Sequence, residues 1–182
     1  MPNEHKSYEK FRETLTPEQK SESVEKVIKA LDRFINEGMA PYQAIDMPPS
    51  ILEVGYGEAY RLYKTGLYEK AQKYFEFLML LNPVETKYIL GAAACLQMRK
   101  YYRAAIVGYE TLAGFMPNSP LPYFYIYECC MQLNMFDEAR EALEKVITLA
   151  DSDPTEYAHM KEKAQVMLEG HQSLYTKGES KE

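Results

Sequence analysis

The chain has 182 residues, 46% of them hydrophobic, which is enough for one domain of ordinary size and too few for two generous ones. Its formal net charge of -6 and pI near 5.3 argue against a nucleic-acid or anionic-membrane partner. No apolar run approaches the ~18–20 residues of a membrane span, so we expect no membrane insertion. The first six residues hold no apolar core and do not resemble a signal peptide.

The N-terminal part combines a polar tail with an amphipathic helix. Residues 1–15 are predicted to be a disordered tail. A helix should begin at Thr16-Pro17, because threonine is a good cap and proline suits the first helical position. Apolar residues spaced by three and four then form one stripe, made of Val24, Val27, Ile28, Leu31, Phe34 and Ile35. This stripe requires a cover, either the rest of the chain or a second copy.

A short connection follows, and it closes the N-terminal segment 16–49. Gly38 is a natural helix stop, and Ala40 to Ile45 can form one helical turn. The double proline Pro48-Pro49 breaks any helix. Ser50 to Glu53 is typical of a capping box, so the next helix is expected to begin there.

The centre of the chain repeats itself at a period of 34 residues, that of a tetratricopeptide repeat. Residues of similar type recur in step, as in Ala71, Ala105 and Ala139, in Phe75, Tyr109 and Leu143, and in Leu78, Leu112 and Val146. We therefore predict an all-α fold in which three repeats over residues 50–151 form a right-handed solenoid. Each repeat is a pair of antiparallel helices, with the first near 51–64, 86–98 and 120–132 and the second near 68–81, 102–115 and 136–149.

Two kinds of position in the repeat have a direct structural meaning. The alanines stand where the helices of each pair cross, because only a small side chain allows the axes to approach within ~8–10 Å. Gly66 occupies the tight turn of the first repeat, where the second and third repeats carry Lys100 and Asn134. Asparagine tolerates a left-handed turn better than lysine does, so we expect the second repeat to turn differently.

The last predicted segment covers residues 152–177, and its helix begins at Asp153-Pro154, with the aspartate as cap and the proline at the first helical position. Its apolar side is made of Tyr157, Met160, Ala164, Met167, Leu168, His171 and Tyr175. Because a short solenoid leaves an apolar face open at its end, we expect this helix to be the cap. Residues 178–182 are predicted to be a charged tail.

No catalytic constellation is present in the sequence. There is no phosphate loop, no Cys-x-x-Cys and no pair of histidines at metal-ligand spacing. Cys95 and Cys129 lie one period apart, which favours small buried packing residues over redox partners. We predict that the protein is not an enzyme and holds no cofactor or metal.

The first helices of the repeats are predicted to line a concave groove. The residues expected to face it are Tyr56, Tyr60, Tyr63, Leu90, Ala94, Gln97, Leu121, Phe124, Tyr125, Glu128 and Met131. Aromatic residues at helical spacing are ordinarily core, but Ala59 and Leu62 already fill that role here. The tyrosines therefore favour a wall for an extended peptide with apolar anchors and prolines, and Gly91 is expected to leave room for an inserted side chain. The groove lacks the paired basic residues of repeat proteins that clamp a Glu-Glu-Val-Asp terminus.

The segment from Tyr88 to Gln97, with Leu90-Gly91 and Ala94-Cys95-x-Gln97, resembles the class II chaperones of bacterial type III secretion systems, the LcrH/SycD-like family. Tyr127-Glu128-Cys129 is similar to that family's third repeat. The leading and trailing helices also match its layout, so the resemblance covers roughly residues 24–170.

The resemblance implies a cytoplasmic bacterial chaperone of the two hydrophobic translocators that form the secretion pore. It implies that a Pro/Leu-containing segment of the client lies in the groove, which keeps the client ready for secretion. It also implies a homodimer formed through the stripe on the N-terminal helix. The alternative is a repeat scaffold that binds a folded partner in another envelope or secretion assembly.

Overall fold

The computed structural model describes residues 16–178, with the side chains of 16–18 and 21–170. Every element of regular structure in this range is a helix, so the all-α prediction is confirmed. The helices are α2 (Pro17–Ile35), α3 (Pro41–Ala44), α4 (Pro49–Lys64), α5 (Tyr68–Leu81), α6 (Thr86–Met98), α7 (Tyr102–Phe115), α8 (Leu121–Gln132), α9 (Phe136–Ala150) and α10 (Pro154–Gly178). The chain divides into two compact units, with the boundary between Ile51 and Leu52.

The first unit holds α2 and α3 together through one arginine. The Arg33 guanidinium donates a hydrogen bond to the carbonyl of Ala44 (3.0 Å) and pairs with the Asp46 carboxylate (2.8 Å). At the start of α3 the Ala40 N–H donates to Gln43 Oε1 (3.0 Å), so a glutamine side chain caps this single turn. The chain leaves α2 through Gly38, which has a left-handed φ of +69°.

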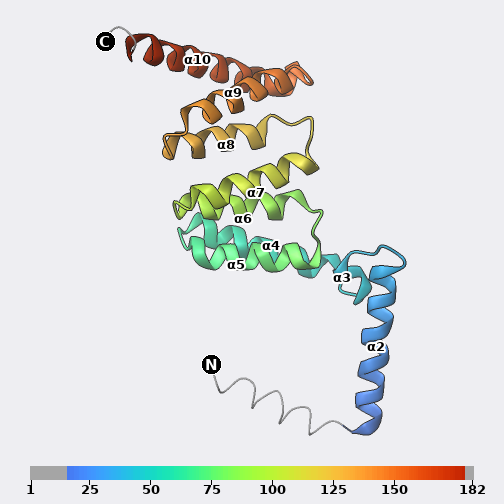
Figure 1. The fold of residues 1–182 in the computed structure, drawn as a ribbon. Helices are drawn as coiled ribbons and strands as arrows, with labels where there is room; N and C mark the ends of the chain where they lie inside the picture. The colour runs from blue at the N-terminus through green and yellow to red at the C-terminus, as the bar shows by residue number, and fades with distance from the viewer. Residues whose placement is uncertain (1–15, 179–182) are drawn as a thin grey trace. The chain divides into compact units, whose positions relative to one another are not determined.

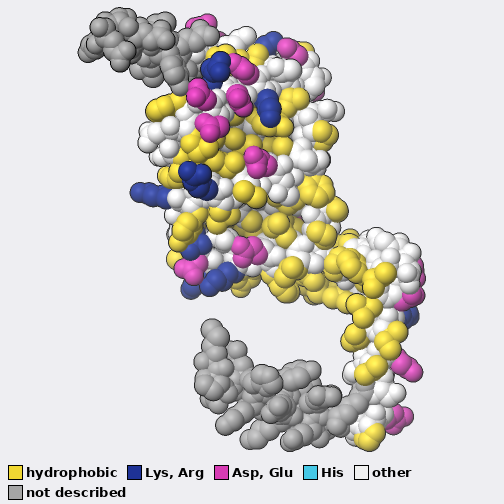
Figure 2. Space-filling model, in the orientation of Figure 1, with side chains coloured by type: hydrophobic (Ala, Val, Ile, Leu, Met, Phe, Trp, Pro, Cys, Tyr) yellow, Lys and Arg dark blue, Asp and Glu magenta, His cyan; other side chains and the backbone are white. Residues whose placement is uncertain are grey.

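The apolar stripe of α2 is exposed along its whole length. Its six side chains keep between 47% (Phe34) and 68% (Ile35) of their surface accessible. Figure 2 shows hydrophobic side chains along one side of α2 and charged ones along the other. The prediction of an amphipathic helix is therefore confirmed.

The second unit stacks α4 to α10 in chain order as antiparallel neighbours, each packed on the next (Figure 1). The crossing residues Ala71, Ala105 and Ala139 are fully buried, as are Tyr109 and Leu143, with Phe75 2% exposed. The bounds of the six repeat helices agree with the predicted ones to within two residues. The period of 34 thus located both the helices and their buried faces.

The two capping signals at Ser50 and Asp153 have different outcomes. Helix α4 already begins at Pro49, so Ser50 lies inside the helix, and Glu53 Oε1 accepts a hydrogen bond from Lys87 Nζ (2.7 Å) in the next repeat. The capping box predicted at Ser50 is therefore wrong. Before α10, by contrast, Asp153 Oδ1 accepts hydrogen bonds from two backbone N–H groups at 3.0 Å, and this cap is confirmed.

The turns inside the three repeats share one conformation. Gly66, Lys100 and Asn134 all have left-handed backbones, with φ of 79°, 65° and 57°. In each, the turn residue's N–H bonds the carbonyl three residues back at 3.0, 2.9 and 3.2 Å, and the next N–H bonds the carbonyl five residues back at 2.9, 2.9 and 3.0 Å. The expectation that the second repeat turns differently is wrong, because two backbone hydrogen bonds outweigh the side-chain preference of lysine.

Helix α10 covers the end of the repeats, as predicted. Ala164 is fully buried in a cluster with Phe124, Leu143 and Val146, and Met160, Met167 and Leu168 pack around it. The side chains of His171 and Tyr175 and the predicted tails, apart from Gly178, lie outside the described residues.

The three cysteines are buried and free, in agreement with a packing role.

In the part of the chain that the structure describes, no helix combines the length and apolar character needed to cross a bilayer.

The strained turn at Lys100 leads to a stability prediction. A non-glycine residue in the left-handed region costs ~1–2 kcal/mol, so Lys100→Gly should relieve most of this cost and raise the melting temperature by ~2–4 °C. Asn134→Gly is the matched control and should give a smaller rise, since asparagine tolerates this conformation. Melting followed by circular dichroism tests both, and a lower melting temperature for Lys100→Gly would contradict the assignment.

Candidate functional site: a two-part groove across the repeats

The first helices of the repeats, α4, α6 and α8, line two cavities that share Gln97, Met98 and Glu128. One cavity, of about 370 Å³, is walled by rings from α4 and from the neighbouring repeats, and we call it the aromatic cavity. Eight of the predicted groove residues line it: Tyr56, Tyr60, Tyr63, Leu90, Ala94, Gln97, Tyr125 and Glu128.

The tyrosines of α4 form a continuous ridge with a graded exposure. Tyr56 stacks on Tyr60 with ring centroids 6.3 Å apart and meets Phe75 edge-on at 6.0 Å. Tyr63 is half-buried, and burial raises its pKa above the ordinary value. Tyr60 is the most exposed of the three, at 49%, so it offers the most ring surface to a ligand.

The ring of Phe75 closes the floor of the aromatic cavity next to Gly91. A Cβ added at Gly91 would lie 2.5 Å from Phe75 Cε1, which means that the ring occupies the space the missing side chain provides. The expectation that Gly91 leaves room for an inserted side chain is therefore wrong. Gly91 instead allows Phe75 to sit directly beneath the cavity, which its ring helps to line.

A hydrogen-bonded relay crosses the groove from the core to the boundary of the two cavities. The hydroxyl of buried Tyr109 donates to Gln97 Oε1 (2.6 Å), and Gln97 Nε2 donates to Glu128 Oε2 (2.9 Å). Burial raises the pKa of Tyr109 well above its ordinary value, so its hydroxyl keeps the proton that it donates. The Tyr109 ring also stacks on Tyr125 with centroids 4.9 Å apart. The relay ties α6, α7 and α8 into one preformed wall.

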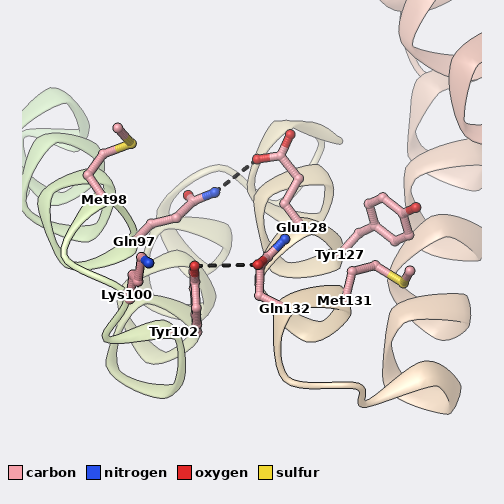
Figure 3. Close-up of a pocket in the computed structure, with 8 residues that line it drawn as sticks. All are labelled: Gln97, Met98, Lys100, Tyr102, Tyr127, Glu128, Met131 and Gln132. Carbon is pink, nitrogen blue, oxygen red and sulfur yellow. Dashed lines mark hydrogen bonds between the residues drawn. The ribbon is translucent and has the colours of Figure 1, made fainter.

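The second cavity, of about 510 Å³, lies beyond the relay, and we call it the methionine cavity. Its lining residues are Gln97, Met98, Lys100, Tyr102, Tyr127, Glu128, Met131 and Gln132 (Figure 3). Met131 is a predicted groove residue and is found here. Tyr102 donates a long hydrogen bond to Gln132 Oε1 (3.5 Å), which crosses the cavity between α7 and α8.

A lysine marks the edge of the aromatic cavity. Lys87 Nζ pairs with Glu53 at 2.7 Å and lies 4.8 Å from the centroid of the Tyr56 ring. The side chain therefore links α4 to α6 and shields one face of the tyrosine ridge. Hydrogen bonding to Glu53 is the main cause that raises the pKa of Lys87.

The predicted groove residues Leu121 and Phe124 line neither of these cavities. Phe124 is buried and packs with Leu143, Val146 and Ala164, so the structure places it in the core beneath α10. The position equivalent to it in the first repeat, Tyr56, likewise contacts the following repeat through Tyr88, with centroids 6.0 Å apart. In the third repeat α10 packs where a following repeat would otherwise lie. Phe124 is buried against α10 and therefore does not line the groove.

Several lining residues were absent from the predicted set. Phe75 and Tyr109 were assigned to the core only, although each also presents an edge to the aromatic cavity. Lys100, Tyr102 and Gln132 line the methionine cavity from turn and helix-end positions. The signal that could have found Lys100 is its place in a turn where a sister repeat carries glycine.

The residues of the groove offer no metal site: within the described range, no group of three or more His, Cys, Asp or Glu side chains could hold an ion. Chemically, the groove is able to contact an extended peptide. It combines apolar rings, a fixed amide–carboxylate pair and two flexible thioethers.

Comparisons with known proteins identify the family. No protein-family model matches the chain. The chaperone protein SicA of Salmonella dublin is 25% identical over 164 residues, which cover 90% of this chain and 96% of SicA. The crystal structure of PcrH from Pseudomonas aeruginosa is 30% identical, covers 69% of this chain and 95% of PcrH, and superposes with a TM-score of 0.63. The chain belongs to the family of type III secretion translocator chaperones.

A further member of this family has been solved with a ligand. The Yersinia enterocolitica chaperone SycD, in complex with a peptide of the translocator YopD, is 28% identical to this chain, covers 69% of it and 95% of SycD, and gives a TM-score of 0.64. SicA and SycD are chaperones by name, which agrees with the prediction of a protein that is not an enzyme.

The packing of Phe75 under Gly91 gives a prediction for the shape of the groove. Gly91→Ala should displace the Phe75 ring into the aromatic cavity and lower the free energy of unfolding by ~1–3 kcal/mol. Gly57→Ala is the matched control, because nothing lies within 4 Å of its added Cβ. In a helix interior it should stabilise by ~0.5–1 kcal/mol. Urea unfolding of both variants measures the contrast, and equal effects would show that the ring does not depend on Gly91.

Proposed function

We propose that this chain is the cytoplasmic chaperone of bacterial type III translocators and holds an extended client segment in its two-part groove. The observation that carries this proposal is the preformed wall, in which exposed Tyr60 lines the same cavity as the Tyr109–Gln97–Glu128 relay. A fixed wall binds a flexible segment at low conformational cost to the chaperone, which is what a carrier that must later release its client requires.

The chemistry of the cavities supports a segment with apolar and proline anchors. Tyrosine faces provide rigid apolar area for proline and leucine side chains. Their hydroxyls can donate hydrogen bonds to, or accept them from, an extended backbone, and the Glu128 carboxylate can accept them. Crystal structures show relatives with translocator segments bound: PcrH with the chaperone-binding regions of PopB and PopD, and SycD with a YopD peptide. Membership of this family favours a chaperone over a scaffold for a folded partner.

The exposed stripe of α2 supports a homodimer. Six large apolar side chains on one helix face, each at least 47% exposed, form a surface that a second copy of the same helix would bury. The Yersinia enterocolitica chaperone SycD has been crystallised as an alternative dimer, so dimers occur among relatives. We place the dimer interface of this chain on Val24, Val27, Ile28, Leu31, Phe34 and Ile35.

The exposure of Tyr60 in the groove predicts that its removal weakens client binding without lowering the stability of the fold. Tyr60→Ala should weaken client binding by ~1–3 kcal/mol while leaving the melting temperature unchanged, because the ring is exposed and packs little. The client is first taken from the native host by co-expression and mass spectrometry, and its bound segment is then titrated as a synthetic peptide. Tyr74→Ala is the control, since Tyr74 is similarly exposed on α5 but lines neither cavity. If Tyr60→Ala lowers the melting temperature as much as a core mutation does, Tyr60 is a core residue and not part of a binding wall. If no translocator is found among the captured proteins, the proposed chaperone function is wrong.

The dimer proposal is tested on α2 itself. Leu31→Glu or Phe34→Glu should shift sedimentation towards the monomer, because a charge would be buried without a partner in the interface. Lys29→Glu serves as control, since Lys29 is exposed on the side of α2 opposite the stripe. A sedimentation coefficient that stays unchanged for both stripe variants would remove α2 from the interface.

A further inference from the structure

The turn of the second repeat holds a strained residue that the fold does not require. Lys100 has φ of 65°, in the same turn where the first repeat uses Gly66 at 79°. Glycine adopts this conformation without a Cβ clash, whereas lysine does so only at a cost in free energy. Residues kept in a sparsely populated backbone conformation are concentrated at functional sites. Lys100 is therefore a candidate for a role in binding.

The position of Lys100 sets it apart from its two equivalents. Lys100 lines the methionine cavity, whereas Gly66 and Asn134 line neither cavity. In Figure 3, Lys100 lies on the same side of the cavity as Gln97 and Tyr102, and Glu128 and Gln132 lie on the other side. Its side chain is exposed, and the ion pairs among the described residues do not include it. The ammonium group is therefore available to a ligand.

The charges of the groove have a definite order. Glu128 lies at the boundary of the two cavities, where Gln97 holds one of its oxygens at 2.9 Å. Lys87, at the other end of the aromatic cavity, is already paired with Glu53. An acidic group on a bound segment is thus repelled at the centre of the groove. Of the two described lysines that line the cavities, Lys87 is paired and Lys100 is not.

We propose that Lys100 binds one carboxylate of the segment held in the groove, and thereby fixes the direction in which the segment lies. This inference rests on the proposed function, because it places the charge relative to the apolar anchors in the aromatic cavity. A lysine is suited to the task, since its flexible stem can follow a single carboxylate that is not held in a rigid fork. Met98 and Met131 provide an adaptable apolar lining for the neighbouring atoms.

The carboxylate has two possible sources, an Asp or Glu side chain or the C-terminus of a peptide. Only one is needed, which distinguishes this site from a clamp that grips two carboxylates with several basic residues. The experiment therefore uses a positional series of fluorescein-labelled synthetic peptides with fixed Pro and Leu anchors, in which one glutamate moves along the chain. Each glutamate peptide has a glutamine twin, all carry an amidated end, and one glutamine peptide is also made with a free C-terminal carboxylate.

We expect wild-type protein to prefer glutamate over glutamine at one position on one side of the anchors, by roughly three-fold in Kd at low salt, as for an exposed ion pair. Raising the ionic strength should remove the preference. Lys100→Gln should abolish it while leaving the melting temperature unchanged, because glutamine keeps the strained backbone. Lys70→Gln, an exposed lysine on α5 that lines neither cavity, should leave it intact.

The Lys100→Gly variant distinguishes a role in binding from a purely structural role of Lys100. It should raise the melting temperature and yet lose the preference for glutamate, so stability and recognition change in opposite directions. The inference is overturned if peptides bind and Tyr60→Ala weakens them, but glutamate and glutamine twins bind wild type equally. It is also overturned if the preference survives in Lys100→Gln. If no peptide binds or Tyr60→Ala has no effect, the proposed function of the groove itself fails.

Discussion

The close approach of the two helices in each repeat is the constraint on which the rest of the structure depends. At Ala71, Ala105 and Ala139 the side chain is a single methyl group with no exposed surface, and the helix axes can meet there. This crossing fixes the rotation of each helix about its axis. It sends Phe75, Tyr109 and Leu143 inwards, and leaves the opposite side of α4, α6 and α8 to form the groove. A larger residue at the crossing would therefore disturb the binding surface as well as the core.

The parts of the fold that the sequence predicts well are those set by local or periodic chemistry. The bounds of α5, α6 and α7 match the expected ranges because each helix is defined by apolar positions that recur at 34 residues. The cap at Asp153 was also predictable, since one carboxylate reaches two nearby N–H groups. At Ser50 the same local rule failed, because Pro49 could begin the helix two residues earlier than expected and Glu53 had a partner in the next repeat.

The groove is harder to predict because it depends on neighbours that do not follow the period. Phe124 carries the right repeat position for the wall, yet α10, which lies outside the repeats, packs over it. From the sequence, Gly91 is expected to leave an open space because it has no side chain. Only the structure shows that the Phe75 ring occupies this space. At Lys100 the prediction of the turn conformation was wrong for a different reason. Its side chain argued against a left-handed turn, but the two backbone hydrogen bonds of that turn are available to any residue and prevail.

Tyr109 shows why the core and the groove cannot be adjusted independently. Its ring belongs to the core by repeat position and is fully buried, whereas its hydroxyl must still find a hydrogen-bond partner. It finds that partner in Gln97, whose amide is thereby oriented to hold Glu128 at the boundary of the two cavities. The same ring stacks on Tyr125 in the wall. Packing in the interior thus determines where the groove presents its central carboxylate, and the charge order of the groove is fixed before any ligand binds.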